Sequence, residues 1–324
     1  MRILVASKID PGALATLQAD HDVDVAMGVT GEALAARMAD REALVFRSGV
    51  SIDEDLLDRA PALRLIVRAG SGLDNLDLAS VAARGISLQR IPGPGARAVA
   101  EMTFALFLAL ARQVPVADRL LREGRWAKNE LVGWNLGGKT LGVVGLGSIG
   151  STVARLGRAW DMDVVGCVER PDPRREAAFL AEGIRLASFH DVLAGSDFVS
   201  VHVPLDPTTR GLIGASELMR MRPGSFLVNI ARGGVVDEGA LLAALRSGER
   251  PAGAGLDVHV AEGDGKVSPL AGLPNVVLTP HIGATTVDAQ REIGAEIVRL
   301  IDAADHREDV THDHASDAGL EVRP

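Results

Sequence analysis

Three short segments in the second half of the chain carry the side chains best suited to chemistry. They are NIARGGVVDE at 229–238, GLDVHVAEG at 255–263 and TPHIGATT at 279–286. Each follows a predicted strand, and ligands of parallel sheets collect at the carboxyl ends of the strands. Together the segments offer one cation, Arg232, one carboxylate, Glu262, and one imidazole, His281.

A set of this kind suits hydride transfer between a nicotinamide and a carbinol carbon. When hydride reaches a carbonyl carbon the oxygen needs a proton, and histidine can give it because its ordinary pKa lies close to physiological pH. A carboxylate on the far ring nitrogen fixes the tautomer. An arginine fork binds a carboxylate at two points. We therefore predict His281 as the acid–base group, Glu262 as its partner and Arg232 as the substrate clamp.

A glycine-rich turn earlier in the chain predicts a dinucleotide site. Gly145, Gly147 and Gly150 form the pattern G-x-G-x-x-G between an apolar strand at 140–144 and a helix. The first glycine permits a tight turn, the second lets a pyrophosphate approach the backbone, and the third lets the helix pack on the strand. The free N–H groups at the start of the helix also attract phosphate. The alternative is a plain strand–turn–helix whose glycines bind nothing.

The end of the next strand leaves the choice between NAD and NADP open. An acid about 20 residues after the glycine turn binds the ribose hydroxyls in such folds. Glu169 stands in that place, which favours NAD. Arg170, Arg174 and Arg175 follow it directly, and arginine can accommodate the 2′-phosphate of NADP.

Short apolar runs that alternate with helical patterns must position these residues. The predicted strands are 3–6, 23–26, 44–46, 65–67, 86–88, 140–144, 164–168, 198–202, 226–230, 255–258 and 276–279. The predicted helices in the first half are 11–19, 31–39, 52–60 and 76–83, with longer helices at about 98–112 and 287–303. This alternation indicates an α/β protein with two doubly wound parallel sheets.

Composition restricts the class of protein. Lys+Arg 34 against Asp+Glu 43 gives a net charge of −9, which argues against broad binding of nucleic acid or an anionic membrane. The single cysteine, Cys167, excludes an intramolecular disulfide framework. The longest apolar run, 104–111, is short for a membrane helix, and the first residues lack the pattern of a secretory signal. We expect a soluble cytoplasmic protein with no metal site.

The order of the motifs resembles the D-isomer-specific 2-hydroxyacid dehydrogenase family. The matching stretches are G-L-G-S-I-G, N-I-A-R-G-G-V-V-D-E, G-L-D-V and P-H-I-G-A-T-T, and the resemblance covers about residues 1–304. It implies a Rossmann cofactor domain, 98–285, inserted into a flavodoxin-like substrate domain, 1–97 and 286–304. It also implies a homodimer. The polar residues 305–324 are expected to form a loose tail.

The resemblance also assigns site residues. It places the family's catalytic arginine, glutamate and histidine on Arg232, Glu262 and His281, and its nicotinamide-binding aspartate on Asp257. The expected cofactor contacts are Gly145, Gly147, Ser148, Ile149, Gly150, Glu169, Arg170, Val203, Pro204, Thr209, Ile230, Ala231, Arg232, Asp257, His281 and Gly283. The expected substrate contacts are Arg47, Arg68, Gly70, Ser71, Gly72, Lys128, Arg232 and His281.

Three positions in two of the motifs depart from the family pattern. Where the family often has D-V-F-x-x-E-P, this chain has His259 in place of phenylalanine and Gly263 in place of proline. The family's common acid after the second cofactor strand aligns with Val168, one residue before Glu169.

The pattern RAGSGLDN at 68–75 and the cations Arg47, Arg68 and Lys128 are most similar to members that oxidise 3-phosphoglycerate. That similarity implies a role in serine biosynthesis, in a short form without a serine-binding regulatory domain. A hydroxypyruvate or glyoxylate reductase and a dehydrogenase of a phosphonate acid stay open as alternatives. So does a protein of another class, a dinucleotide-sensing scaffold like the transcriptional corepressors that share this fold.

Overall fold

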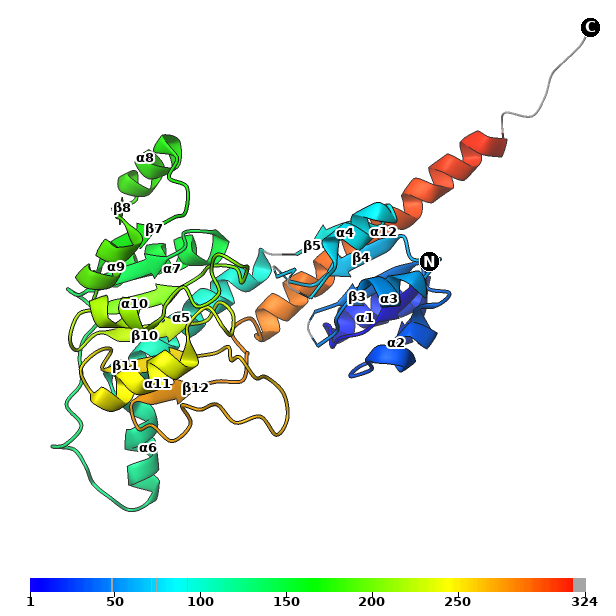
Figure 1. Ribbon diagram of the computed structural model, residues 1–324. Helices are drawn as coiled ribbons and strands as arrows, with labels where there is room; N and C mark the ends of the chain where they lie inside the picture. Colours follow the sequence, from blue (N-terminus) through cyan, green and yellow to red (C-terminus); the bar gives the residue numbers. More distant parts are fainter. Residues whose placement is uncertain (48, 71, 74, 92, 317–324) are drawn as a thin grey trace, which may run out of the picture. The chain divides into compact units, whose positions relative to one another are not determined.

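The computed structural model divides into two compact units. It describes residues 1–316 except 48, 71, 74 and 92, and for 307–316 it describes the backbone alone. Unit 1 comprises Met1–Gly95 and the segment from Thr286 onward, and unit 2 comprises Ala96–Thr285. Unit 2 is therefore an insertion between the two parts of unit 1, and each unit has its own sheet (Figure 1).

Unit 1 is a five-stranded parallel sheet in the order β2-β1-β3-β4-β5, which is the flavodoxin-like order. Its strands are β1 Arg2–Val5, β2 Asp22–Val25, β3 Ala43–Phe46, β4 Leu65–Arg68 and β5 Ser87–Arg90. Its helices are α1 Pro11–Asp20, α2 Gly31–Met38, α3 Glu54–Asp58, α4 Leu78–Ala83 and α12 Val287–Ser316. β3 and β4 are buried along their whole length because helices cover both faces of the sheet.

Helix α12 returns the chain to unit 1. Its apolar residues Ile293, Ile297 and Ile301 recur every fourth position and are buried with Ile3 and Val45 on one face of the sheet. The helix continues to Ser316, so the expectation of a loose tail from 305 is wrong for 305–316. A formed helix gains one hydrogen bond for each residue added, so polar residues can extend it beyond its buried part. Residues 317–324 lie outside the described part of the chain.

Unit 2 is a seven-stranded parallel sheet in the order β12-β11-β10-β9-β6-β7-β8. The strands are β6 Thr140–Val144, β7 Asp163–Cys167, β8 Ile184–Leu186, β9 Phe198–Val201, β10 Phe226–Asn229, β11 Gly253–Leu256 and β12 Val276–Leu278. The helices are α5 Pro94–Ala111, α6 Val114–Arg122, α7 Ser148–Ala159, α8 Pro173–Ala181, α9 Phe189–Gly195, α10 Ala215–Arg220 and α11 Glu238–Ser247. The strand order reverses between β6 and β9, where doubly wound sheets bind their ligands. The predicted class, a Rossmann unit inserted into a flavodoxin-like unit, is confirmed.

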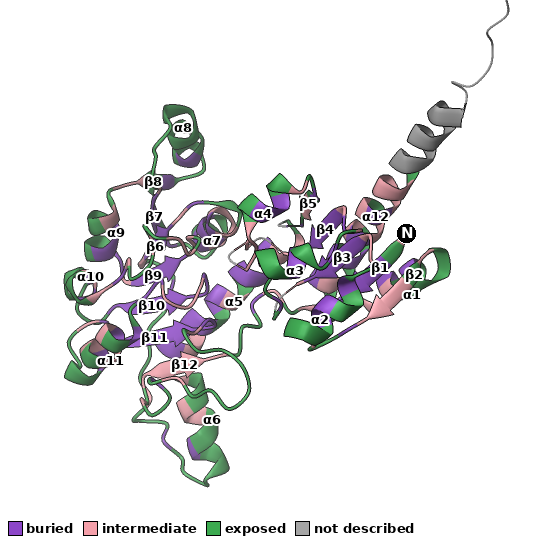
Figure 2. Ribbon diagram, turned by 45° about the vertical axis from the view of Figure 1, so that its right-hand side comes forward, coloured by how far each residue is buried: buried purple, intermediate pink, exposed green. Residues whose placement is uncertain are grey.

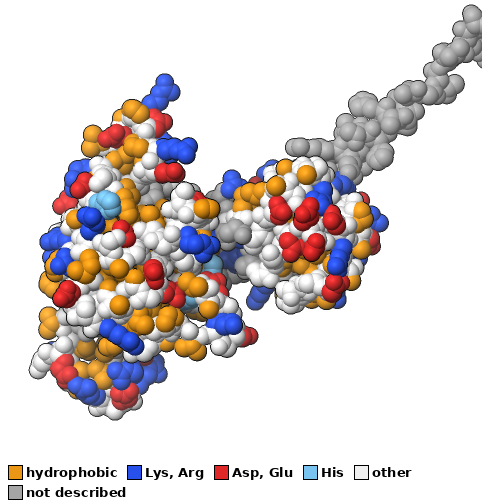
Figure 3. Space-filling model, in the orientation of Figure 1, with side chains coloured by type: hydrophobic (Ala, Val, Ile, Leu, Met, Phe, Trp, Pro, Cys, Tyr) orange, Lys and Arg blue, Asp and Glu red, His pale blue; other side chains and the backbone are white. Residues whose placement is uncertain are grey.

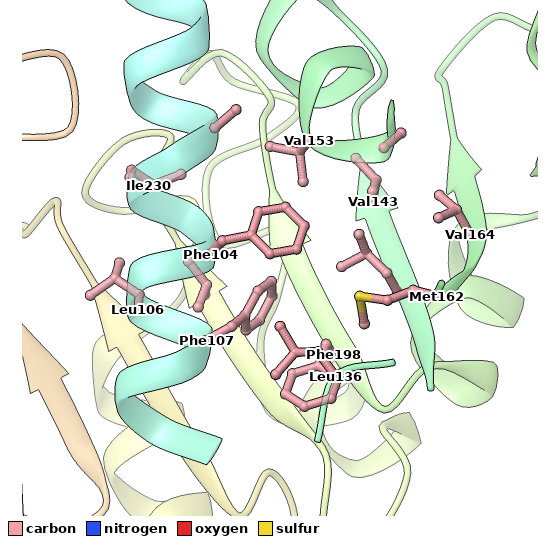
Figure 4. Packing of buried hydrophobic residues seen from close by; sticks show 14 of the residues in the cluster. Phe104, Leu106, Phe107, Leu136, Val143, Val153, Met162, Val164, Phe198 and Ile230 are labelled. Carbon is pink, nitrogen blue, oxygen red and sulfur yellow. The ribbon is translucent and has the colours of Figure 1, made fainter. Parts of the chain in front are cut away.

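The core of unit 2 forms where α5 packs on the sheet. Phe104 and Phe107 of α5 lie among Val143, Val153 and Phe198 (Figure 4). The rings of Phe107 and Phe198 meet edge to face, with centroids 5.2 Å apart. Figure 2 shows that the central strands of this sheet are buried, that the edge strand β12 is partly exposed, and that the outer faces of the helices are exposed.

Helix α5 is the one helix, among the described residues, that is long and apolar enough by composition to cross a membrane. The sequence expectation counted only uninterrupted apolar residues and missed this. In the structure 56% of the helix is buried. Its apolar side chains pack on the sheet of unit 2, so the fold itself accounts for its hydrophobicity.

Candidate active site

The glycine turn after β6 leaves room for a ligand at one glycine and packs tightly at the other two. Gly145 has a φ of 93°, and a Cβ there would lie 2.6 Å from the carbonyl oxygen of His202. A Cβ on Gly150 would lie 1.9 Å from the carbonyl oxygen of Gly145, so only glycine lets α7 approach the strand this closely. A Cβ on Gly147 would meet nothing within 4 Å. The turn therefore fits a dinucleotide whose pyrophosphate approaches the backbone at Gly147.

The turn after β10 holds Arg232. Asn229, which is buried, accepts a hydrogen bond from the N–H of Ala231 at 3.1 Å and donates one to the carbonyl oxygen of Arg232 at 3.0 Å. The Arg232 guanidinium donates to the carbonyl oxygen of Ala231 at 2.7 Å. A Cβ on Gly233 would lie 1.9 Å from the carbonyl oxygen of His259, so the turn packs directly on the segment after β11. Arg232, the predicted substrate clamp, therefore lies on a turn that is held by hydrogen bonds. This turn packs against the segment that carries Glu262.

Asp257, directly after β11, organises the segment after β12. Its carboxylate is buried and accepts hydrogen bonds from the Thr279 hydroxyl at 2.6 Å and from the N–H groups of Ile282 and Gly283 at 2.9 and 2.7 Å. Its own N–H donates to the carbonyl oxygen of Asn229 at 3.1 Å. A carboxylate has about four acceptor positions, so this group is mostly committed to holding the turn that carries His281.

Glu262 and His281 form a direct pair. Nδ1 of His281 lies 2.9 Å from Oε2 of Glu262, and because a carboxylate only accepts, Nδ1 carries the proton. The other oxygen, Oε1, accepts the N–H of His259 at 3.1 Å. The pair therefore leaves Nε2 of His281 as the nitrogen that can exchange a proton with a substrate.

The environment keeps Glu262 ionised. Partial burial by itself would raise the pKa of Glu262. The hydrogen bonds from His281 and from the backbone of His259, together with the charges of the two imidazoles, outweigh burial and hold that pKa below its ordinary value. His281 is one of three non-glycine residues with positive φ among the described residues, at 54°. Such a conformation costs free energy and persists where surrounding contacts impose it.

Comparison with known proteins agrees with this geometry. The family model of the D-isomer specific 2-hydroxyacid dehydrogenase NAD binding domain matches residues 104–283, more than half of the chain. The chain belongs to this family. The matched range begins within α5 and includes the glycine turn, Arg232, Glu262 and His281.

Relatives of known sequence and structure extend the match over nearly the whole chain. The D-3-phosphoglycerate dehydrogenase of Mycobacterium tuberculosis is 41% identical over 325 residues, 99% of this chain and 61% of that protein. The Archaeoglobus fulgidus enzyme of the same name is 40% identical over 93% of this chain and 56% of its own length. This chain thus spans about three fifths of the curated relatives it matches.

A solved structure agrees as well. The D-lactate dehydrogenase of Aquifex aeolicus, complexed with NAD and lactic acid, superposes with a TM-score of 0.83 at 28% identity over 99% of both chains.

The cofactor contacts expected from the sequence all follow strands of the unit 2 sheet. Gly145, Gly147, Ser148, Ile149 and Gly150 follow β6, and Glu169 and Arg170 follow β7. Val203, Pro204 and Thr209 follow β9, Ile230, Ala231 and Arg232 follow β10, Asp257 follows β11, and His281 and Gly283 follow β12. The structure brings Glu262 and His281 into contact, and it joins the Arg232 turn to them through the packing of Gly233 on His259. Glu169 has an exposed side chain 3.7 Å from Arg170.

The substrate candidates of unit 1 lie at the ends of β3 and β4. The N–H of Arg47 donates to the Ser7 hydroxyl at 3.0 Å, and burial lowers the pKa of the Arg47 guanidinium. Arg68 is buried, and its guanidinium carbon lies 5.3 Å from the centroid of the Phe46 ring. The guanidinium packs against Gly70, where a Cβ would lie 2.9 Å from it. Gly72 follows in the same loop, and Ser71 lies outside the described residues. In unit 2, Lys128 is exposed after α6.

Sequence reasoning missed several residues that support the site. Asn229 and Thr279 lie inside the recognised motifs, but a motif does not say which carbonyl or carboxylate a side chain meets. The His259 ring donates from Nε2 to the carbonyl oxygen of Thr279 at 3.0 Å, which ties the segment of Glu262 to that of His281. His202, beside the glycine turn, has Nε2 2.9 Å from the Ser200 hydroxyl. Burial lowers the pKa of His202 to about 3.

Proposed function

We propose that this protein is an NAD-dependent dehydrogenase of D-2-hydroxy acids. The single observation that carries the proposal is the Glu262–His281 hydrogen bond of 2.9 Å at the same sheet edge as the open glycine turn. An imidazole whose proton is held on Nδ1 by a carboxylate is an oriented acid–base group. A dinucleotide turn at the same edge of the sheet provides the place for a hydride carrier.

In the oxidation, Nε2 of His281 takes the proton of the substrate hydroxyl. The carbon that bears this hydroxyl gives up its hydride. Bound NAD supplies the hydride acceptor. Glu262 remains a carboxylate and stabilises the imidazolium that forms at His281. Arg232 binds the substrate carboxylate and holds the reacting carbon in position. In the reduction, His281 returns the proton to the oxygen as hydride arrives.

The proposed substrate is 3-phosphoglycerate. The curated relatives at about 40% identity carry the name D-3-phosphoglycerate dehydrogenase. This acid bears a carboxylate and a phosphate, and Arg47 and Arg68 at the ends of β3 and β4 are suited to bind anionic groups. The Gly70–Gly72 loop and Lys128 complete the proposed substrate contacts. We assign the reaction to serine biosynthesis in the cytoplasm.

A kinetic screen tests the proposal. The full chain is assayed at the reduced-nicotinamide absorbance band with 3-phosphoglycerate in the oxidation and with hydroxypyruvate, glyoxylate and pyruvate in the reduction. We expect the highest kcat/KM with 3-phosphoglycerate. A preference for hydroxypyruvate or glyoxylate would reassign the substrate. Turnover with none of these acids, together with retained dinucleotide binding, would indicate a sensing scaffold instead.

The proposed assembly is a homodimer formed through an apolar strip on unit 2. We define this strip by its exposed side chains, which are Val114, Leu121, Trp126, Val132 and Trp134. Val114 and Leu121 line one surface hollow, and Leu121 and Trp126 line another. Exposed apolar side chains that gather in this way indicate a protein contact. Charges of both signs flank it in the pairs Arg122–Asp118 and Arg125–Glu130, and the same mixture appears over α6 at the lower end of unit 2 in Figure 3. Mixed charge makes the surface complementary to a second copy of itself.

Sedimentation tests the dimer. The double variant Leu121→Lys with Trp126→Ser places a charge and a polar group in the apolar strip. We expect the wild type to sediment as a dimer and this variant as a folded monomer. Met219→Lys, at an exposed apolar side chain on α10, is the matched control and keeps the dimer. A monomeric wild type would contradict the assignment.

A further inference from the structure

The segment after β7 adjoins the glycine turn. β7 pairs with β6 so that Cys167 lies opposite Val144, and the N–H of Gly145 donates to the carbonyl oxygen of Cys167 at 3.0 Å. The residues that follow Cys167 therefore start beside the turn that we assign to the dinucleotide. In such folds the side chains at this point meet the 2′ position of the adenosine ribose.

No carboxylate occupies the first position after β7. Val168 stands there and packs against the hydrophobic core of unit 2. Glu169 is the next residue, but its side chain is 78% exposed and its carboxylate lies 3.7 Å from the Arg170 guanidinium. A carboxylate held at the strand end would repel a 2′-phosphate. Val168 carries no charge and cannot repel the phosphate. The Arg170 guanidinium offsets the negative charge of Glu169.

Arginines gather at the start of α8 instead. Asp172 caps the helix by accepting the N–H of Arg174 at 2.8 Å, so Arg174 and Arg175 lie in the first turn. The Arg175 guanidinium donates to the carbonyl oxygen of Leu146, between Gly145 and Gly147, at 3.1 Å. Its central carbon lies 5.9 Å from the centroid of the Phe179 ring, which also restrains it. The bond to Leu146 fixes a positive charge on the glycine turn itself.

We propose that Arg170, Arg174 and Arg175 form a subsite for the 2′-phosphate of NADP(H), so that this protein accepts NADP(H) as well as NAD(H). The inference rests on the dinucleotide site of the proposed function and adds the cofactor range to it. A phosphomonoester dianion is a better partner for guanidinium groups than a ribose hydroxyl, because each N–H···O bond to it is charge-assisted.

Binding measurements on the full chain test the subsite without turnover. NADPH and NADH are titrated separately while the fluorescence of the reduced nicotinamide is recorded. We expect the two Kd values to agree within about tenfold, which is about 1.4 kcal/mol. A Kd for NADPH more than about tenfold above that for NADH would overturn the inference, because a repelled 2′-phosphate costs at least that much.

Variants locate the effect. We expect the double variant Arg174→Ala with Arg175→Ala to raise the Kd for NADPH about fivefold more than the Kd for NADH. Equal losses for both cofactors would place these arginines on the shared pyrophosphate and overturn the assignment. Glu169→Gln removes a negative charge and should tighten NADPH relative to NADH. Arg246→Ala, at an exposed arginine in the last turn of α11, removes the same charge elsewhere and should leave the ratio of Kd values unchanged.

The inference and the proposed function can fail separately. Tight binding of NADPH without oxidation or reduction of any acid tested would leave the subsite standing and remove the dehydrogenase. Turnover of 3-phosphoglycerate with NAD, combined with rejection of NADPH, would leave the dehydrogenase standing and remove the subsite.

Discussion

Two parts of the same sheet edge in unit 2 are built in opposite ways. After β6 the proposed site consists of glycines, which have no side chains. A Cβ added at Gly147 would meet no protein atom within 4 Å. After β11 and β12 the site depends on side chains that bind one another, with three hydrogen bonds onto Asp257 and two onto Glu262. The comparison teaches that the first part is sensitive to added atoms and the second to removed functional groups. The substitutions below test this difference.

The largest effect is expected in the segments after β11 and β12, where the site depends on side chains. His281→Ala removes the group that exchanges the substrate proton, and general acid–base catalysis contributes about 10²–10⁴-fold. We expect kcat to fall by about that factor, while the variant still binds NADH in the fluorescence titration. Wild-type kinetics in this variant would show that the proton is exchanged elsewhere.

The glycine turn after β6 should respond differently to a methyl group added at Gly150 and to one added at Gly147. Gly150→Ala places a Cβ 1.9 Å from the Gly145 carbonyl oxygen, so the turn must shift. We expect a lower Tm together with cofactor binding weaker by about tenfold or more. Gly147→Ala meets no protein atom within 4 Å, so its Tm should stay unchanged while binding of the dinucleotide weakens. A stable Gly150→Ala protein with normal NADH affinity would contradict the packing argument.

Glu262→Gln should have a moderate effect that is present from pH 5 to pH 8. The variant keeps an acceptor for His281 but loses the charge that stabilises the imidazolium, and we expect kcat to fall about tenfold. The pKa of Glu262 lies below its ordinary value of 4.5, so the carboxylate stays charged from pH 5 to pH 8. The lower activity of the variant should therefore be seen throughout this range. A variant that matches the wild type near pH 5 would show that Glu262 is protonated there.

The smallest effect concerns stability beside the glycine turn. Burial lowers the pKa of His202 to about 3 from an ordinary 6.5, so the unfolded chain binds a proton that the folded chain refuses. The contribution of neutral His202 to the free energy of unfolding is therefore fully present above pH 6.5. It is lost progressively as the pH falls from 6.5 toward 3. His202→Gln has no titrating group, and its Tm should decrease by about 2–4 °C less than that of the wild type between pH 7 and pH 4.5. If the Tm of the two proteins falls in parallel between pH 7 and pH 4.5, His202 does not cause the loss of stability.

The sequence predicted those features that depend on neighbours along the chain. The glycine turn follows its strand as expected, and Asp10 caps α1 before Pro11 by accepting the N–H of Ala13. The stripe of Ile293, Ile297 and Ile301 on α12 is buried as its spacing predicts. Such features depend on local backbone conformation and on a period of 3.6 or 2 residues, both of which can be read from a short window.

Other features could not be predicted from the sequence because they join distant segments. The short strand β8 carries little apolar signal but pairs with β7. The polar end of α12 has no apolar period, yet it continues a helix that is already formed. The hydrogen bonds from Arg175 to Leu146 and from His259 to Thr279 span 29 and 20 positions of the chain. No local pattern states which carbonyl oxygen lies within reach of a long side chain.

The amino-acid sequence by itself determined the two parallel sheets, the glycine turn and the presence of one guanidinium, one carboxylate and one imidazole after successive strands. Backbone periodicity and strand–turn–helix order are enough for that. Only the tertiary structure decided that Glu262 meets His281, that Asp257 is committed to the turn before Gly283, and that an arginine from α8 rests on the glycine turn. The reason is physical: hydrogen bonds need their atoms within about 3 Å, and it is the packing of the strands, turns and helices that sets those distances.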